Sequence, residues 1–403
     1  MTDGKIRALL VENIHPEAVS RLESEGYLVE TLSSALDEDE LVERLPGVSL
    51  LGIRSKTRLT PRVLDAADRL VAIGAFCIGT DQIDLAAAAA GGVAVFNAPF
   101  SNTRSVVELA LAEIIALTRR LTDKNEKMHG GVWDKDAQGS HEVRGRTLGI
   151  VGYGNIGTQL SVLAENLGMT VYFYDTDDRL SLGNARRCET LEDLLEVADV
   201  VTLHVDGRAG NSGFFGDAQF ARMRPRSLFL NLSRGFVIDH AALRRHLASG
   251  HIAGAAVDVF VHEPKSRGEE FRSELRGLPN VILTPHIGGS TEEAQADIGR
   301  FVANKLVTFV SDGNTTLSAN LPSVALLARE TTHRLAHIHR NTPGVLAQVN
   351  SILARHAVNV EGQLLATRGE VGYVLTDIGR NFSEEVLTEL RAMPETIGLR
   401  VLS

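Results

Sequence analysis

The segment TLGIVGYGNIGTQLSVLAENLGMTVYFYD, residues Thr147–Asp175, decides the fold of this chain. It begins with an apolar run at Leu148–Val151, which predicts a buried strand. A turn with three glycines follows, and apolar residues then recur at helical spacing until Gly168 ends the helix. A second apolar strand, Val171–Tyr174, leads to the end of the segment. This order of strand, turn, helix and strand predicts a βαβ unit in a parallel sheet.

The three glycines, Gly152, Gly154 and Gly157, have the G-x-G-x-x-G spacing of a dinucleotide-binding turn. The first permits the tight turn, the second lets a pyrophosphate approach the backbone, and the third lets the helix pack close to the strand. Asp175 ends the second strand, where its carboxylate can accept hydrogen bonds from ribose hydroxyls and would repel a 2′-phosphate. A glycine turn alone is a weak signal, but the flanking strands, helix and acid are all present. We therefore predict that this unit binds NAD rather than NADP.

The composition is typical of a globular protein with two or three domains. The chain has 403 residues, of which 44% are hydrophobic and 23% are charged. Its formal net charge of −10 argues against binding to nucleic acid or to an anionic membrane. An anionic small-molecule substrate would therefore need a local group of basic residues.

Cysteine usage and the N-terminal residues favour a cytoplasmic protein. Cys77 and Cys188 are too few and too far apart in the sequence for a disulfide framework, so we expect two reduced thiols. The first residues, MTDGKIRALLVENIHPE, predict a strand and not a signal peptide. The apolar helical stretch Val106–Leu117 is too short and too charged to cross a membrane.

The first hundred residues alternate between apolar strands and helices, a pattern typical of a doubly wound parallel sheet. The expected strands are Ile6–Val11, Tyr27–Thr31, Leu50–Ile53, Val71–Ala75 and Val93–Phe96. The expected helices are Pro16–Ser24, Asp39–Leu45, Pro61–Ala67 and Asp84–Ala90. These first hundred residues have no phosphate-binding glycine turn of their own.

Further strands are expected after Asp175, and a different pattern begins near residue 330. The strands are Val200–His204, Ser227–Asn231, Gly254–Asp258 and Val281–Thr284. A helix from Thr291 to about Val310 can return to the first domain, and the polar stretch Asp312–Pro322 is a linker candidate. The remaining order is βαββαβ, with Thr332–Arg340, Gly344–Arg355, Val358–Thr367, Val371–Asp377, Ser383–Met393 and Leu399–Leu402.

The predicted fold is therefore α/β, with two doubly wound Rossmann-like domains and a C-terminal βαββαβ domain. We expect a discontinuous substrate-binding domain at residues 1–100 and 290–315. The NAD-binding domain is expected at residues 101–289, and the C-terminal domain at residues 330–403.

Three segments follow strands of the NAD-binding domain and should meet at its carboxyl edge, where open parallel sheets bind ligands. They are Asn231–Gly235, Asp258–Pro264 and Thr284–Ser290. Hydride transfer between an alcohol and a ketone also moves one proton, and His286 can exchange that proton near neutral pH.

Three other residues in these segments suit the same chemistry. Glu263 could pair with the other ring nitrogen of His286, raise the pKa of His286 and fix its tautomer. Arg234 can bind a carboxylate and polarise a carbonyl oxygen, and Asp258 is placed to contact the nicotinamide ribose or carboxamide. Taken singly, a histidine in a T-P-H turn is more often structural, and an arginine after a strand is more often a surface charge. Their combination with a dinucleotide turn indicates a hydride-transfer site.

The motifs G-Y-G-N-I-G, S-R-G, H-E-P and T-P-H-I-G-G-S-T, in this order, resemble those of the D-isomer-specific 2-hydroxyacid dehydrogenases. The segments F-C-I-G-T and F-N-A-P-F-S-N-T-R-S-V and the C-terminal domain resemble the family members that act on 3-phospho-D-glycerate and carry an ACT regulatory domain. The resemblance covers nearly the whole chain. It implies NAD-dependent oxidation of 3-phospho-D-glycerate to 3-phosphohydroxypyruvate, the first step of L-serine synthesis, with feedback regulation through the C-terminal domain.

The resemblance also implies roles for residues that match the family's motifs. The catalytic residues would be Arg234, Glu263 and His286, with His286 the proton donor in the reductive direction. The NAD contacts would be Gly152, Gly154, Asn155, Ile156, Gly157, Asp175, Leu232, Ser233, Arg234, Asp258, His286, Ile287, Gly288 and Gly289. The substrate contacts would be Arg54, Ser55, Lys56, Asn102 and Lys135, and the effector contacts would be His339, Asn341 and Asn359. No metal ion is expected.

Some of these residues also have simpler explanations. Arg54 and Lys56 follow a strand, where cations can meet a phosphate, but such residues are more often solvated turn charges. Trp133 and Lys135 match a segment that in relatives reaches the neighbouring subunit's active site. A single tryptophan is also typical of a core or an interface.

The effector residues leave a choice as well. Asn341 and Asn359 flank a Pro343-Gly344 turn and could bind the carboxylate and ammonium of an amino acid, although turn and cap roles fit them too. The resemblance implies L-serine, bound where two C-terminal domains pair. However, Thr342 stands where serine-regulated relatives commonly carry arginine, which leaves weaker serine binding or another effector as alternatives.

Other functions stay open at this stage. The chain could be a 2-oxoacid reductase acting on 2-oxoglutarate or glyoxylate, or a slow-turnover NAD-sensing protein that acts as a corepressor. The C-terminal domain could be only an oligomerisation device. We expect a homo-oligomer, either a dimer through the NAD-binding domains or a tetramer through paired C-terminal sheets.

Overall fold

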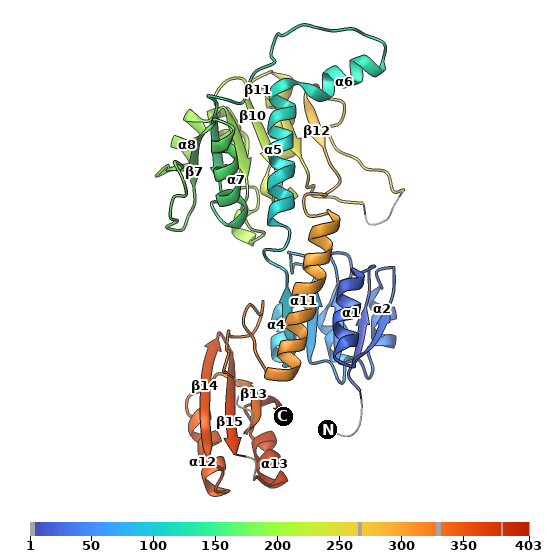
Figure 1. Cartoon of the computed structure of the whole chain (residues 1–403), viewed down its shortest axis with the longest axis vertical. Coiled ribbons are helices and arrows are strands. Elements are labelled where there is room, and N and C mark those ends of the chain that lie inside the picture. The colour runs from blue at the N-terminus through green and yellow to red at the C-terminus, as the bar shows by residue number, and fades with distance from the viewer. Residues whose placement is uncertain (1–4, 265–267, 328–331, 380–381, 403) are drawn as a thin grey trace. The chain divides into compact units, whose positions relative to one another are not determined.

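The computed structural model describes residues 5–264, 268–327, 332–379 and 382–402 (Figure 1). The predicted domain ranges also include residues 1–4, 265–267, 330–331, 380–381 and 403, which lie outside the described residues. The chain divides into two compact units. Unit 1 comprises Met1–Ser101 and Ala296–Ser403, and unit 2 comprises Asn102–Gln295.

Unit 2 is built on a seven-stranded sheet in the order β12-β11-β10-β9-β6-β7-β8, with every pair of neighbours parallel. The strands are β6 (Thr147–Val151), β7 (Thr170–Tyr174), β8 (Arg186–Arg187), β9 (Val200–Leu203), β10 (Ser227–Asn231), β11 (Ile252–Val257) and β12 (Val281–Leu283). The strand order reverses between β6 and β9, so the crevice for a ligand is expected beyond the carboxyl ends of these two strands.

Helices cover both faces of this sheet. On one face, α5 (Thr103–Arg119) and α7 (Asn155–Asn166) lie side by side and share a core with β6 and β10 (Figure 1). On the other face, α8 (Leu191–Val197), α9 (Asp217–Arg222) and α10 (His240–Ala248) share a second core. Two short 3₁₀ helices, η1 (Ala209–Asn211) and η2 (Gly235–Val237), follow β9 and β10. In contrast, α6 (Leu121–His129) buries none of its residues.

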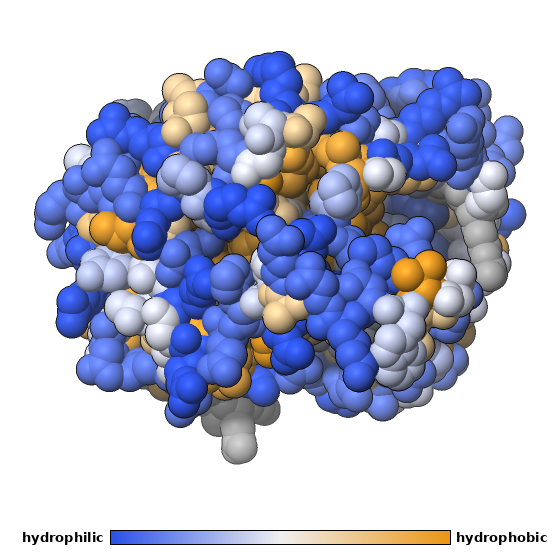
Figure 2. All heavy atoms as spheres, turned by 90° about the horizontal axis from the view of Figure 1, so that it is seen from above, coloured by the Kyte–Doolittle hydropathy of each residue, from blue (hydrophilic) through white to orange (hydrophobic). Residues whose placement is uncertain are grey.

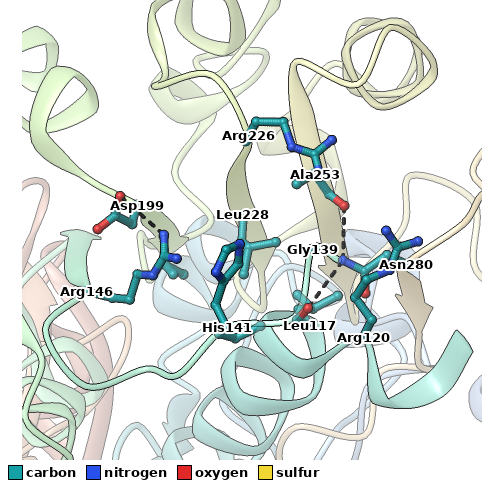
Figure 3. Close-up of a pocket in the computed structure, with 12 residues that line it drawn as sticks. Leu117, Arg120, Gly139, His141, Arg146, Asp199, Arg226, Leu228, Ala253 and Asn280 are labelled. Carbon is teal, nitrogen blue, oxygen red and sulfur yellow. Dashed lines mark hydrogen bonds and ion pairs between the residues drawn. The ribbon is translucent and has the colours of Figure 1, made fainter. Parts of the chain in front are cut away.

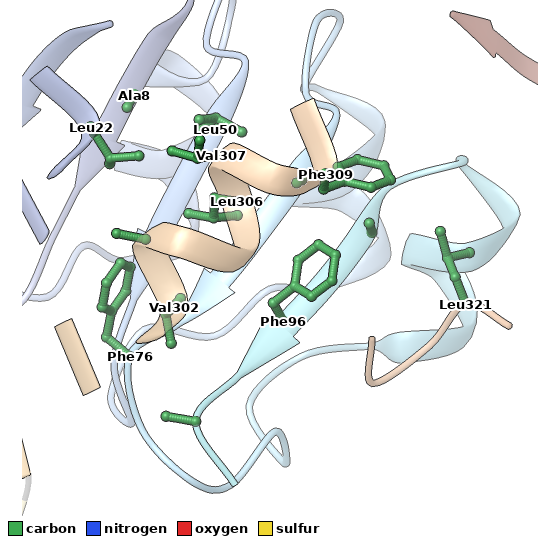
Figure 4. Packing of buried hydrophobic residues seen from close by; sticks show 14 of the residues in the cluster. Ala8, Leu22, Leu50, Phe76, Phe96, Val302, Leu306, Val307, Phe309 and Leu321 are labelled. Atoms are coloured by element: carbon green, nitrogen blue, oxygen red, sulfur yellow. The ribbon is translucent and has the colours of Figure 1, made fainter. Parts of the chain in front are cut away.

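Unit 1 contains a five-stranded parallel sheet in the order β2-β1-β3-β4-β5. Its strands are β1 (Arg7–Leu10), β2 (Leu28–Thr31), β3 (Leu50–Ile53), β4 (Ala72–Ala75) and β5 (Ala94–Asn97). Its helices are α1 (Pro16–Ser24), α2 (Glu38–Arg44), α3 (Pro61–Asp65), α4 (Leu85–Ala90) and the unit 1 part of α11 (Glu292–Asp312). Figure 4 shows α11 packed on the sheet through Val302, Leu306 and Phe309. Gly74 permits this approach, because a Cβ there would lie 2.7 Å from a Val302 methyl carbon.

The C-terminal part of unit 1 is a four-stranded antiparallel sheet in the order β14-β15-β13-β16, with helices on one face. Its elements are β13 (Thr332–Arg340), α12 (Val345–Arg355), β14 (Val360–Arg368), β15 (Val371–Gly379), α13 (Glu384–Ala392) and β16 (Thr396–Leu402). The other face, including Tyr373 and Leu375, joins the same core as Phe309 of α11. The guanidinium of Arg400 lies 4.1 Å from the Phe309 ring centroid and donates to the Phe309 carbonyl at 3.0 Å. One continuous core therefore holds both sheets of unit 1 together.

A buried arginine ties the segment after α11 to the C-terminal sheet. Arg334 pairs with Asp377 through two hydrogen bonds of 2.7 and 2.9 Å, and both side chains are almost fully buried. The remaining N–H groups of Arg334 donate to the carbonyl oxygens of Asp312, Leu326 and Leu327. A buried guanidinium is tolerated because all of its donors have partners.

The face of the molecule in Figure 2 is mostly hydrophilic, with hydrophobic residues in small separate groups, as expected for a protein surface. Within the described residues, no helix combines the length and the apolar character that crossing a bilayer requires.

The predicted fold class is confirmed, and most predicted strands agree with the structure within two residues. Among the elements without a predicted range are β8, which is only two arginines long, and α6, which has no apolar face to bury. The last strand begins at Thr396, three residues before the prediction, because partly exposed residues on this edge strand pair with β13.

Candidate active site

The glycine turn has the shape that a dinucleotide requires. Gly152 has φ +93°, and a Cβ there would lie 2.5 Å from the His204 carbonyl oxygen. A Cβ on Gly157 would lie 2.3 Å from the Gly152 carbonyl oxygen, so helix and turn are in direct contact. In contrast, a Cβ on Gly154 would meet no atom within 4 Å. This open space lies at the N-terminus of α7, which has no side-chain cap and can receive the pyrophosphate of NAD.

Asp175 is held in place by the turn itself. Its carboxylate accepts hydrogen bonds from the backbone N–H groups of Tyr153, at 2.7 Å, and Asp177, at 2.9 Å. Each carboxylate oxygen thus uses one backbone donor and can still accept a ribose hydroxyl. The residues around the glycine turn therefore fit NAD, as the sequence predicts.

His286 and Glu263 form the predicted pair. The Nδ1 atom of His286 lies 2.9 Å from Oε2 and 3.1 Å from Oε1 of Glu263. This hydrogen bond is the main cause of the raised pKa of His286, since burial and the charge of Arg234 act in the opposite direction. Burial is the largest single effect on Glu263 and would raise its pKa. The hydrogen bond and charge of His286, the Phe260 N–H and the charge of Arg234 together outweigh burial and leave that pKa below its usual value. Because Nδ1 faces Glu263, Nε2 is the atom that can exchange a proton with a ligand.

Asp258 organises the turn that carries His286. Its buried carboxylate accepts hydrogen bonds from Thr284 Oγ1 at 2.6 Å and from the backbone N–H groups of Ile287 and Gly288, both at 2.8 Å. The His286 N–H donates to the Asp258 carbonyl at 2.8 Å, and His286 itself has φ +55°. Sequence reasoning assigned Asp258 a coenzyme contact, which stays a prediction. It missed this positioning role because hydrogen-bond partners across a turn leave no spacing signal.

The loop after β10 is fixed by Asn231. The Asn231 Oδ1 atom accepts hydrogen bonds from the N–H and the hydroxyl of Ser233, at 3.1 and 2.7 Å. Its amide donates to the carbonyl of Arg234 at 3.1 Å. The charge of Arg234 acts on both His286 and Glu263, so the structure brings the three predicted catalytic residues into one neighbourhood. Leu232 and Ser233, in the same loop, are buried.

Asn102 also belongs to this neighbourhood. It precedes α5 and makes no side-chain cap for that helix. A Cβ on Gly289 would lie 2.4 Å from Asn102 Nδ2, so the amide packs directly on the turn that carries His286.

The predicted substrate loop of unit 1 is shaped by a residue that the sequence did not single out. The buried carboxylate of Glu12 accepts hydrogen bonds from the backbone N–H groups of Arg54 at 3.0 Å, Lys56 at 3.0 Å and Thr57 at 2.8 Å. Ser55 and Lys56 are exposed and Arg54 is half-buried. Glu12 therefore fixes the loop backbone while the cationic side chains can reach a ligand.

Lys135 and Trp133 lie on the extended segment after α6. Lys135 Nζ is 5.7 Å from the centroid of the Trp133 ring, which belongs to a side chain that is 72% exposed. Lys124 and Lys127 both pair with Asp134, at 2.9 and 2.8 Å, and hold this segment against α6. Within the described residues, nothing joins it to the His286 turn.

One chain does not bring the predicted effector residues together. Asn341 lies beside one end of β15, where its amide donates to the Gly369 carbonyl at 3.0 Å. Asn359 lies at the other end, where its carbonyl accepts from the Gly379 N–H at 3.3 Å. The nine residues of β15 separate them by on the order of 25 Å. His339 is buried against Gly372, on the Asn341 side.

Comparison with known proteins adds to this geometry. Residues 111–288 match the NAD binding domain of the family described as D-isomer specific 2-hydroxyacid dehydrogenase, and residues 335–398 match the AHAS small subunit-like ACT domain. A D-3-phosphoglycerate dehydrogenase of Dictyostelium discoideum is 48% identical over 99% of this chain and 97% of its own length. One from Escherichia coli (strain K12) is 49% identical over 99% of this chain and 98% of its own length. A crystal structure of a protein from Thermus thermophilus has a TM-score of 0.69 and 29% identity, covering 75% of this chain and 96% of that one.

Replacing Glu263 with glutamine should lower the pKa of His286, because the amide keeps the shape of the carboxylate but not its charge. His286 can donate a proton only when it is protonated, so reductive activity should decline at a lower pH in E263Q than in the parent. The pH profile of kcat/KM for NADH oxidation measures this shift. The E270Q variant, which removes an exposed carboxylate paired with Arg272, is the control. An unmoved alkaline limb in E263Q would contradict the pairing.

Proposed function

Because the chain belongs to the D-isomer-specific 2-hydroxyacid dehydrogenase family, we propose that it oxidises 3-phospho-D-glycerate to 3-phosphohydroxypyruvate, with NAD as the coenzyme. This reaction is the first step of L-serine synthesis. The near-full-length relatives confirm the resemblance predicted from the motifs. The observation that carries the proposal is the His286–Glu263 hydrogen bond in a neighbourhood that also contains Arg234.

We infer a task for each of these residues from the geometry. Bound NAD⁺ supplies the acceptor for the hydride that leaves C2 of the substrate. Neutral His286 accepts the C2 hydroxyl proton at Nε2, and Glu263 stabilises the imidazolium that forms. Arg234 binds the substrate carboxylate and polarises the developing carbonyl oxygen. Proton and hydride thus leave the same carbon–oxygen unit.

The phosphate requires cations, and we propose that Arg54 and Lys56 provide them. Within the described residues, neither side chain forms an ion pair, while Glu12 holds their backbone N–H groups. Phosphate binding would give these two residues the anionic partner they lack.

Replacing His286 with asparagine should lower kcat by about 10²–10⁴-fold, the usual contribution of a general acid–base group. Asparagine tolerates the left-handed backbone of this position, so the turn is expected to persist. NADH affinity, measured by fluorescence titration, should change little. The H262N variant, in the neighbouring H-E-P motif, is the matched control and should keep its kcat. A fully active H286N enzyme would exclude the proposed role.

Replacing Arg54 with alanine should separate the proposed function from reduction of 2-oxoglutarate or glyoxylate. Loss of one phosphate cation should raise KM for 3-phosphohydroxypyruvate at least tenfold and leave KM for 2-oxoglutarate nearly unchanged. The R58A variant removes an exposed arginine from the same loop and is the control. Equal effects on both substrates would favour the reductase alternative.

A slow NAD-sensing protein is the other alternative. The assembled Arg234, Glu263 and His286 disfavour it, because a coenzyme sensor needs no general acid. A steady-state NADH absorbance assay with 3-phosphohydroxypyruvate distinguishes turnover from binding alone.

We propose that the enzyme is a cytoplasmic homo-oligomer, a dimer or a tetramer, and that its ACT domain binds L-serine. Cys77 and Cys188 are not joined by a disulfide, which supports a reducing compartment. The unburied helix α6 and exposed Trp133 support contact with a second copy. The distance between Asn341 and Asn359 supports a serine site that takes one amide from each of two chains.

If the site is shared in this way, N341A and N359A enzymes should each lose serine inhibition, and a co-assembled mixture should regain part of it. The mixture restores an intact pair of amides only when they come from different chains. Initial rates at increasing L-serine measure the inhibition, and N350A, which alters an exposed amide on α12, is the control. Deleting everything after Pro322 is less informative, because it would expose the apolar surface around Phe309 that Tyr373 and Leu375 cover. Lack of serine inhibition in the parent enzyme would favour the alternative in which the ACT domain serves only for oligomerisation.

A further inference from the structure

Three residues with left-handed backbone line one pocket in unit 2. They are Arg120, Arg226 and Asn280, with φ values of 52°, 68° and 52°. A Cβ disfavours this conformation, and glycine would adopt it more easily at all three positions. Such outliers concentrate at functional sites, where the surrounding structure maintains them.

The pocket lies at the amino edge of the sheet, away from the coenzyme. Its floor includes Val200, Leu228 and Ala253, at or near the first residues of β9, β10 and β11. Asp258 and the His286 turn follow the opposite ends of strands β11 and β12. The pocket is therefore a separate site within the same unit.

The pocket carries an excess of positive charge. Figure 3 shows Arg120, Arg146 and Arg226 around it, with Arg146 beside Asp199. Asp199 is 3.9 Å from Arg146 but 2.8 Å from Arg224 just outside the pocket, so it balances only one of these two cations. Arg120 pairs with Asp123 at 2.8 Å. No carboxylate within the described part of the chain pairs with Arg226.

Two of the guanidinium groups converge on Gly139. A Cβ built on Gly139 would lie 3.4 Å from Arg120 Nη1 and 3.8 Å from Arg226 Nη2. These two nitrogens are therefore no more than about 7 Å apart, a separation that one oxyanion can bridge with charge-assisted hydrogen bonds of about 2.8 Å. Like charges held this close repel each other until an anion lies between them.

Asn280 adds a buried acceptor to the same pocket. It is 3% exposed, and its Nδ2 donates to the carbonyl oxygens of Ala253 at 3.0 Å and Leu117 at 3.3 Å (Figure 3). Its Oδ1 has no hydrogen-bond partner among the described residues. A buried acceptor of this kind requires a donor, which a hydroxyl group or a water carried by the ligand can supply.

From these observations we propose that the pocket binds a small oxyanion, either free phosphate or the phosphate group of a hydroxylated ester. Arg120 and Arg226 bind the phosphate oxygens, Arg146 adds to the positive field, and Asn280 accepts from a hydroxyl. The site is independent of the reaction at His286.

Calorimetric titration of the full chain with inorganic phosphate tests the proposal. NADH is kept saturating to fill the coenzyme site, and all proteins carry Arg54→Ala, which removes one of the two proposed phosphate cations of the substrate loop and so weakens that site. In this background, Arg226→Gly should weaken phosphate binding at least tenfold. Glycine suits the left-handed backbone at this position, so the fold is expected to be retained.

Two control variants separate the site from general effects. Arg244→Ala removes an exposed arginine elsewhere in unit 2, and Leu317→Gly relaxes a left-handed position outside the pocket. Both should bind phosphate as the R54A parent does. A parallel titration with glycerol 3-phosphate identifies the source: equal affinity indicates free phosphate, and tighter binding indicates an ester. No binding by the R54A parent, or equal binding by the R226G variant, would overturn the proposal.

Discussion

The active site depends on the buried carboxylate of Asp258. It accepts hydrogen bonds from one hydroxyl and two backbone N–H groups of the turn that carries His286. His286 itself has a left-handed backbone conformation that would otherwise be disfavoured. A buried carboxylate is stable here because three donors replace its hydration. The His286 ring faces Glu263 from this turn, so the proton transfer that we propose at Nε2 also depends on Asp258, a residue that need not touch the substrate.

Unit 1 uses the same device. Glu12 accepts three backbone N–H groups from the loop that carries Arg54 and Lys56. In both units a buried acid fixes a backbone and leaves the reactive or cationic side chains to face a ligand. This arrangement places ligand-binding groups without an ordering cost at the moment of binding. It is also compatible with the proposal that an acidic chain presents Arg54 and Lys56 to an anionic substrate.

The sequence predicts this protein well where local pattern and tertiary structure agree. The apolar runs of β6 and β7 and the glycines between them specify the nucleotide-binding unit, because Gly152 and Gly157 each have a steric reason that the structure reproduces. Glu12 could not be found, because it acts through backbone groups more than forty residues away. The distance between Asn341 and Asn359 could not be predicted either. It depends on how β13 and β14 pair with β15, and the sequence of the Pro343-Gly344 turn does not determine that pairing. Helix α6 lacks the apolar face that reveals most helices.

Helix α11 follows the turn that carries His286 in the sequence, and its C-terminal part packs against the ACT domain. Helix α11 begins at Glu292, directly after the turn of residues 284–290, and ends at Asp312. Near its end, the ring and carbonyl of Phe309 contact Arg400 of β16, and the carbonyl of Gly313, just beyond it, accepts a hydrogen bond of 2.6 Å from Tyr373. The C-terminal end of α11 and one face of the ACT-domain sheet therefore share one packed core within unit 1.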